Sequence, residues 1–196
     1  MRSTKLGTMM AVLVLSASTV WAQQDRPLSP RGQASTHIGG KWIDITYGRP
    51  ILRGRNGIFG EGSEYGQQIY AGAPLWRVGA DVTTTINTEA DLVFGGNTLP
   101  AGEYTMFAVL GEGEWTLVFS NLGGKQTFQE ETENTVWGAY GYTDELDVLR
   151  TTMRVSEHSV SADQLIVTFT DVSSDAGTLT VWWDNQIATV PFEVAD

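Results

Sequence analysis

The chain has 196 residues, of which 41% are apolar, and a formal net charge of −11 at pH 7. This length suits one domain with a sizeable core, and the acidic balance argues against nucleic acid as a partner, because nucleic acid binds to positively charged surfaces. The chain contains no cysteine, which excludes disulfide bonds, thiol redox chemistry and thiolate zinc sites.

The first 22 residues are typical of a secretory signal peptide. Arg2 and Lys5 form a short positive region, residues 9–20 form an apolar stretch, and Val20 and Ala22 are placed for cleavage after Ala22. The apolar stretch is too short to cross a membrane, and no lipobox cysteine follows it. We therefore expect an exported protein, periplasmic or extracellular, that is soluble, not a lipoprotein and without stable membrane insertion. An N-terminal core helix is the alternative interpretation.

The segment after the predicted cleavage point is polar. Residues 23–32 contain two prolines and predict a flexible tail, followed by one domain over residues 33–196.

The first pair of strands is predicted around Gly39 and Gly40. Alternating residues flank these two glycines, which is typical of a β-hairpin because glycine adopts positive φ without steric cost. The implied register places His37 opposite Trp42 on the outer face. It places Ile43 and the two alternate residues that follow, Ile45 and Tyr47, on the core face.

The rest of the chain alternates between short apolar runs and turn-forming residues, and we find no amphipathic helix of ten residues. The strand at 103–110 is apolar on both faces, as a central strand would be. In the strand at 147–155, Asp147 and Arg150 are predicted on opposite faces and are not expected to pair. The pattern predicts an all-β, single-domain antiparallel β-sandwich, or a flattened barrel, with one long irregular loop. The expected further strands are 82–88, 91–94, 103–110, 114–120, 147–155, 164–170, 178–183 and 187–194.

The irregular loop spans Tyr47 to Ala80 and is locally basic in an acidic chain. It contains Arg49, Arg53, Arg55 and Arg77, together with many glycines and aromatic residues. Long stretches with little regular structure in compact domains are functional or are held by specific contacts. This loop is therefore the candidate site.

Seven short blocks of sequence resemble an exported bacterial family called domain of unknown function 2911. The likeness covers roughly residues 29–194, and its order and spacing are specific. The chain departs from the family pattern at Gly72-Ala73-Pro74, where members often have Pro-Tyr-Gly before the Trp-Arg pair, so the contribution of that loop tip is open. The resemblance implies a compact exported domain, and it supplies no catalytic residues because the family has no established activity. The blocks are YGRP (47–50), GR (54–55), IFG (58–60), WRVGAD (76–81), LPAGEYTMF (99–107), WGAY (137–140) and DVLR (147–150).

Arginines within these blocks suggest two roles. A guanidinium is a planar donor suited to carboxylate and phosphate groups, so several of them could converge on a cleft for an anionic ligand. Alternatively, they could pair with Asp44, Asp81 or Asp147, or with backbone carbonyls, and fasten the loop to the sandwich. The candidate ligand-binding residues are Tyr47, Arg49, Arg55, Trp76, Arg77, Trp137 and Arg150.

The sequence lacks a recognisable catalytic motif. His37 and His158 are the only histidines and have no zinc-ligand spacing, and no nucleophile elbow or phosphate-binding loop occurs. We predict no catalytic residue, no metal and no cofactor. The sequence favours a non-enzymatic binding or cell-envelope module for an anionic small molecule, a peptide or a glycan. The alternatives are a carboxylate-dependent hydrolase acting on glycans, and a structural or assembly partner that uses an exposed strand edge.

Overall fold

The computed structural model describes residues 27–125 and 127–195. The predicted signal peptide, residues 1–22, lies outside the described residues. The first strand, β1, spans Arg31–Ile38, and so begins slightly before the expected domain boundary at residue 33.

The predicted hairpin at Gly39 and Gly40 is confirmed. β1 pairs antiparallel with β2 (Lys41–Gly48), and His37 lies opposite Trp42, as the alternation predicts. Ile43 and Ile45 are completely buried, whereas the Trp42 ring is half exposed and contacts the His37 ring at 4.9 Å between centroids. The period-2 alternation therefore determines which face of this hairpin enters the core.

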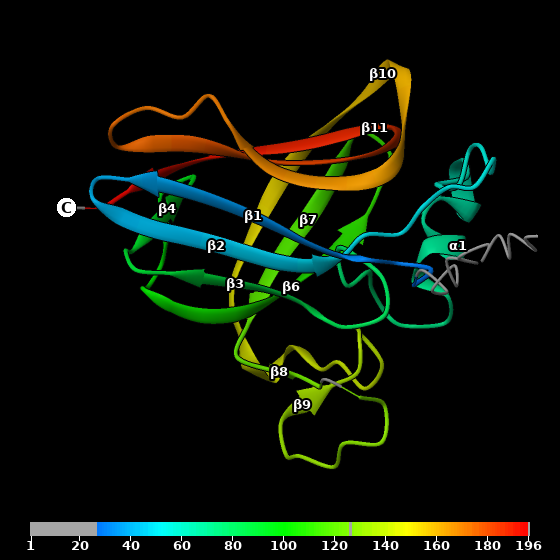
Figure 1. The fold of residues 1–196 in the computed structure, drawn as a ribbon, viewed down its shortest axis with the longest axis horizontal. Helices are drawn as coiled ribbons and strands as arrows, with labels where there is room; N and C mark the ends of the chain where they lie inside the picture. The colour runs from blue at the N-terminus through cyan, green and yellow to red at the C-terminus, as the bar shows by residue number, and fades with distance from the viewer. Residues whose placement is uncertain (1–26, 126, 196) are drawn as a thin grey trace, which may run out of the picture.

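The all-β antiparallel architecture is also confirmed (Figure 1). Within the described residues, nine strands form one sheet in the order β1-β2-β3-β6-β7-β10-β11-β4-β5, and the small parallel pair β8-β9 is separate from it. The sheet folds over the main core, to which nearly every strand contributes, and no ladder between described residues closes it into a barrel. The remaining strands are β3 (Thr84–Thr88), β4 (Leu92–Phe94), β5 (Asn97–Leu99), β6 (Gly102–Leu110), β7 (Glu114–Ser120), β8 (Gly123–Gly124), β9 (Thr135–Val136), β10 (Asp147–Thr170) and β11 (Ala176–Val194).

The last third of the chain differs from the prediction of four separate strands. It forms a single hairpin of two long bent strands, β10 and β11, and the segment around His158 continues β10 instead of forming a turn. The pairing of β10 with β11 shifts register between Glu157 and Ala162, and again before Ile166. Such bulges bend a strand without ending it, and turn-forming residues within them therefore resemble a loop in the sequence.

A seam joins the end of β2 to β10, two strands that are not neighbours in the sheet order. Residues 47–52, which include the last two residues of β2, run against residues 163–167 of β10, with a single bridge between Ile51 and Gln164. The Tyr47 hydroxyl accepts a hydrogen bond from the Val167 N–H (3.0 Å) and donates one to the Val167 carbonyl (3.4 Å). One side chain thus takes the place of a backbone partner where no strand is paired.

A second, smaller core lies on the outer face of β6 and β7. Phe107 and Val118 point away from the main core and are covered by Leu122, Val136 and Ala139 from the segment that carries β8 and β9. β6 is therefore buried on both faces, as predicted for a central strand.

Candidate functional site

The predicted irregular loop gathers at one end of the sheet, where it carries a short 3-10 turn (Gly62–Glu64) and the single-turn helix α1 (Gln67–Tyr70) (Figure 1). Phe59 and Trp76 from this loop are buried in the main core. Trp76 also forms a two-way backbone bridge with Ala108 of β6, with N···O distances of 2.9 and 2.7 Å. The loop is therefore packed into the domain.

A cavity of about 550 Å³ opens between three parts of this loop. Its walls come from the segment after β2, from α1 and its flanks, and from the segment after Trp76, and Trp183 of β11 also lines it. The cavity combines apolar residues with three arginines and a single carboxylate side chain, Asp81. Its lining residues are Leu28, Ser29, Pro50, Ile51, Leu52, Arg53, Arg55, Ile58, Gln68, Ile69, Ala71, Trp76, Arg77, Gly79, Ala80, Asp81 and Trp183.

Arg77 is held in position from several sides. Its Nη1 donates to the Asp81 carbonyl at 2.6 Å, and its Cζ lies 5.3 Å from the centre of the Tyr140 ring. The Tyr140 hydroxyl in turn donates to the Ala71 carbonyl at 2.8 Å. The guanidinium also lies directly over Gly138, where a Cβ would sit 2.2 Å from Cζ. Burial lowers the pKa of Arg77 below its ordinary value of 12.5, as expected for a desolvated cation.

Arg53 and Arg55 are exposed and extend from the other side of the cavity. Arg55 donates from Nε to the Leu52 carbonyl (2.9 Å) and from Nη2 to the Ile51 carbonyl (3.0 Å). Arg53 donates to the Leu28 carbonyl at 2.8 Å. All these acceptors are neutral carbonyl groups.

The three cavity arginines consequently have no carboxylate partner among the described residues. Among the described residues, the one salt bridge joins Arg150 to Asp147, and neither residue lines the cavity. Burial lowers the pKa of Arg77 and the charge of Asp81 partly offsets this effect, but no described carboxylate forms an ion pair with a cavity arginine. The cavity therefore carries more positive than negative side chains, although the chain as a whole is strongly acidic.

The base of the cavity is aromatic and rigid. Trp76 and Trp183 stack with centroids 6.2 Å apart and an interplanar angle of 14°, and Trp115 meets Trp76 edge-on at 5.7 Å. Trp76 and Trp183 are at least 95% buried, and the Trp183 indole N–H has no acceptor among the described residues. Trp76 and Trp183 form the floor of the cavity, with the exposed Arg53 and Arg55 at its rim.

The cavity wall contains unusual backbone conformations. Arg53, Ala71 and Asp81 line the cavity with φ of 54°, 51° and 63°, and Val78, within the same wall, has φ of 48°. A β-branched residue in this region is a genuine outlier, and such strain concentrates at functional sites. The Thr84 hydroxyl stabilises this turn by donating to the Val78 carbonyl at 3.0 Å.

Five of the seven predicted site residues fall into two groups. Arg55, Trp76 and Arg77 come together in the cavity, and Arg53, which the sequence analysis placed in the basic loop but not among the candidates, joins them. Tyr47 and Arg49 lie at the seam, where the Arg49 Nε donates to the Leu165 carbonyl at 3.3 Å.

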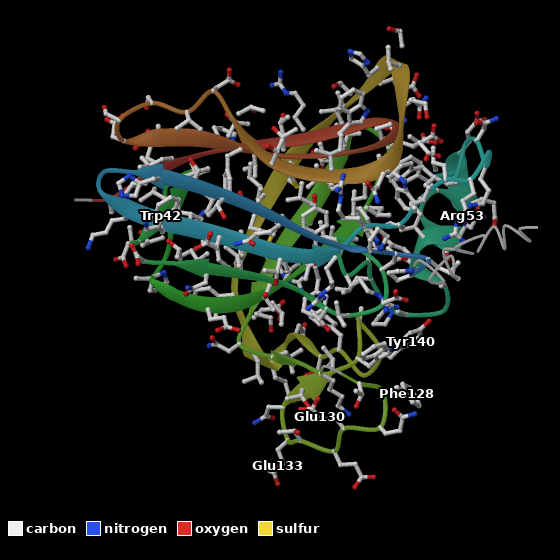
Figure 2. All side chains as sticks on the ribbon, in the orientation of Figure 1. Trp42, Arg53, Phe128, Glu130, Glu133 and Tyr140 are labelled. Atoms are coloured by element: carbon white, nitrogen blue, oxygen red, sulfur yellow. The ribbon has the colours of Figure 1, made fainter. Side chains whose placement is uncertain are left out.

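Trp137 is half-buried and begins the turn that presents Gly138 and Tyr140 to Arg77. It is therefore adjacent to the site and outside the cavity lining. Figure 2 shows Arg53 and Tyr140 at the end of the molecule that carries α1, whereas the half-exposed Trp42 lies at the opposite end.

The expectation that Asp147 and Arg150 do not pair is wrong. Arg150 binds the Asp147 carboxylate at 2.7 Å, and the Tyr142 hydroxyl donates to the same oxygen, also at 2.7 Å. A register shift between Asp147 and Leu149 against β7 inserts one extra residue, which turns Asp147 to the face that carries Arg150.

Comparison with protein-family models decides the identity of the domain. The family model described as "Protein of unknown function (DUF2911)" matches residues 29–192. The chain belongs to this family. No curated protein and no solved structure gives a significant match.

Several blocks that carry the family resemblance form the walls of this DUF2911 cavity. Gly48 of the YGRP block permits close approach of the opposite wall, because a Cβ there would sit 1.8 Å from the Ala80 carbonyl oxygen. The WRVGAD block supplies Arg77 and Asp81, and the WGAY block supplies the turn beneath Arg77. At the Gly72-Ala73-Pro74 departure, Ala73 packs in the second core.

Other chemistry has less support in this DUF2911 domain. Among the described residues, no group of three or more metal-ligating side chains is placed to hold a metal ion, and no helix is long and apolar enough to cross a membrane. A paired-carboxylate mechanism needs two carboxylates across a cleft, and the arginine cavity has only Asp81. Glu61, Glu112 and Glu157 instead line a separate cavity of about 290 Å³.

Proposed function

We propose that the protein is an exported binding module that holds an anionic ligand in the cavity lined by Arg53, Arg55 and Arg77. The observation that carries this proposal is that three arginines line one cavity and, among the described residues, form no ion pair with a carboxylate. Guanidinium groups bind carboxylate and phosphate strongly, through charge-assisted and often bidentate hydrogen bonds.

The arrangement of the site supports binding over a purely structural role. An arginine that only fastens a loop would be expected to pair with one of the many carboxylates of an acidic chain, as Arg150 does with Asp147. Arg77 is instead oriented by a carbonyl, a ring and a glycine. A site whose side chains are already fixed loses less entropy when a ligand binds.

The proposed ligand is an anion rather than a neutral glycan. Trp76 and Trp183 stack on each other and are buried, so they do not form an exposed platform for a sugar ring. Among the described residues, the most exposed tryptophan is Trp42, and it is distant from this site.

The experiment compares Arg77→Gln and Arg55→Gln with Arg154→Gln, a matched change of an exposed arginine on β10 outside the cavity. Binding of benzoate and of methyl phosphate is measured by titration calorimetry. We expect saturable binding of at least one anion to the wild type, at one site per chain. Each cavity variant should weaken it about 10- to 100-fold, since a hydrogen bond to a charged group contributes about 1.5–3 kcal/mol. Arg154→Gln should have no effect, and added salt should weaken binding.

Two results would contradict the proposal. One is equal affinity in the wild type and in both cavity variants. The other is an absence of binding together with a loss of folded structure in Arg77→Gln, as judged by thermal melting. That second result would make Arg77 a structural fastener of the loop.

A further inference from the structure

From the shape and lining of the same cavity, we infer that its ligand is amphipathic: an anionic head on the arginines joined to an apolar body on the floor. This inference rests on the proposed function and adds the chemical class of the ligand. A carboxylate and a phosphate monoester share the head-group chemistry, and the experiment below distinguishes them.

The floor and the rim of the cavity differ in polarity. Ile58, Trp76 and Trp183 line the cavity and are each at least 95% buried, so they form its deep part. Arg53 and Arg55 line the cavity and are exposed, so they form its mouth. Polarity therefore changes along the depth of the cavity, and a ligand that fills it must change polarity in the same direction.

The volume of the cavity favours an organic ligand over a small ion. About 550 Å³ lies within the range of pockets that enclose small organic molecules. An inorganic phosphate or an acetate ion would occupy only the mouth and leave water against Ile58, Ile69 and the two tryptophans. Each methylene group that replaces this water should raise the affinity about fourfold, until the cavity is full.

Apart from the arginines, few side chains of the lining are polar. They are Ser29, Gln68, Asp81 and the indole N–H groups of Trp76 and Trp183, of which the Trp76 group already donates to the Gly79 carbonyl. Asp81 would repel a second negative charge, which favours a single anionic head. A sugar phosphate or a dicarboxylate would place hydroxyl groups or a second charge against the apolar floor, where they would lose hydration without compensation.

The experiment measures affinity across a chain-length series by titration calorimetry. The ligands are acetate, butyrate, hexanoate and octanoate, with 1-octanol as the uncharged analogue and octyl phosphate as the alternative head group. We expect octanoate to bind at least 50-fold more tightly than acetate and 1-octanol to bind far more weakly than octanoate. The tighter of octanoate and octyl phosphate identifies the head group. Arg77→Gln should reduce binding of both octyl anions.

Two floor variants test the apolar body without removing a tryptophan. Ile69 and Ile51 are half-buried lining residues, and each is changed to Asn, with thermal melting to verify that the variants fold. We expect both variants to reduce the gain in affinity from acetate to octanoate, and an unchanged gain in both would contradict the apolar body.

The outcomes separate this inference from the proposed function. If the anions bind, depend on the arginines and show no dependence on chain length, the amphipathic ligand is wrong and the anion site stands. If 1-octanol binds as tightly as octanoate and Arg77→Gln has no effect, the anion site is wrong. If no ligand of the series binds, both are overturned.

Discussion

At the scale of single residues, Arg77 depends on a glycine that lies about 60 positions further along the chain. Gly138 has φ of +63° and passes so close beneath the guanidinium that a methyl group in its place would overlap Cζ. Arg77 therefore stacks on Tyr140 only because the turn from Trp137 to Tyr140 leaves room for it. This turn belongs to the binding site although none of its residues lines the cavity.

We predict that Gly138→Ala will displace Arg77 and weaken anion binding at least tenfold. The matched control is Gly141→Ala, because Gly141 also has positive φ (+81°) but has no atom within 4 Å of the added methyl group. Each variant should lose about 1–2 kcal/mol of unfolding free energy from the backbone strain. Only Gly138→Ala should lose affinity in the calorimetric titration, and equal losses in both variants would show that Arg77 does not depend on this contact.

Local sequence is sufficient to find part of the site. Arg55, Trp76 and Arg77 can be selected because a basic, aromatic, glycine-rich loop is unusual in an acidic chain. Arg53 falls outside the family-like blocks and is therefore missed, and Trp183 can be assigned to one strand face but not to a cavity. The stacking of Tyr140 on Arg77 cannot be predicted from local sequence, because it joins two loops that meet only in the folded protein.

At the scale of elements, the seam between residues 47–52 and β10 determines how the sheet is completed. Tyr47 comes from a strand whose neighbouring residues pair with β1 and β3, yet its hydroxyl bonds to both backbone groups of Val167. The backbone continues the seam through Leu52, whose N–H donates to the Asp163 carbonyl at 2.7 Å, and through Leu165, whose N–H donates to the Pro50 carbonyl at 3.0 Å.

We predict that Tyr47→Phe will lower the unfolding free energy by about 1–3 kcal/mol, because it removes the partner of a buried N–H group. Val167 is 3% exposed, so water cannot easily replace the hydroxyl. Hydrogen exchange should accelerate at the Val167 amide in particular. Tyr104→Phe is the control, since that hydroxyl donates to a carbonyl only four residues away, and it should not change exchange at Val167. Unchanged hydrogen exchange at the Val167 amide in Tyr47→Phe would show that the Tyr47 hydroxyl does not stabilise the seam.

The sequence pattern predicts the individual strands of this fold better than it predicts how the strands bend and pair. Alternation around Gly39 and Gly40 is sufficient to predict the first hairpin residue by residue. The bulges in β10 follow no such pattern, because they depend on how this strand pairs first with β7 and then with β11. The extra residue after Asp147 reverses the predicted relation of Asp147 to Arg150, since one inserted residue exchanges the faces of a strand.

At the scale of the whole molecule, folding buries several tyrosine side chains. Burial raises the pKa of Tyr65, Tyr70, Tyr104 and Tyr142 above the ordinary value of 10.0, and for Tyr142 the adjacent Asp147 carboxylate adds to the effect. The folded protein therefore holds protons on these side chains that the unfolded chain releases. Their contribution to stability is fully present below pH 10 and is lost as the pH rises through the folded-state pKa values.

We predict that the free energy of unfolding will fall above about pH 10, by up to roughly 1.4 kcal/mol per pH unit for each tyrosine that still holds its proton. Urea titrations between about pH 8 and pH 12 measure this dependence, together with the ultraviolet absorbance of tyrosinate. Tyr142→Phe should make the decline less steep, because it removes one of these proton-binding groups. A free energy that stays constant up to pH 11 would contradict the prediction.

The continuous sheet also fixes the order in which the fold can be completed. Tyr47 and its partner Val167 are 120 residues apart in the chain. β4 pairs with the end of β11, so this pairing cannot form until the last strand is present. A fragment that ends before β10 lacks residues 163–167 and cannot form the seam. Trp183 completes the cavity floor only when β10 and β11 have formed their hairpin. Folds that depend on such distant contacts close slowly. A chain exported as the sequence predicts would therefore cross the membrane before it could fold, and the last hairpin would set the moment at which the protein becomes able to bind.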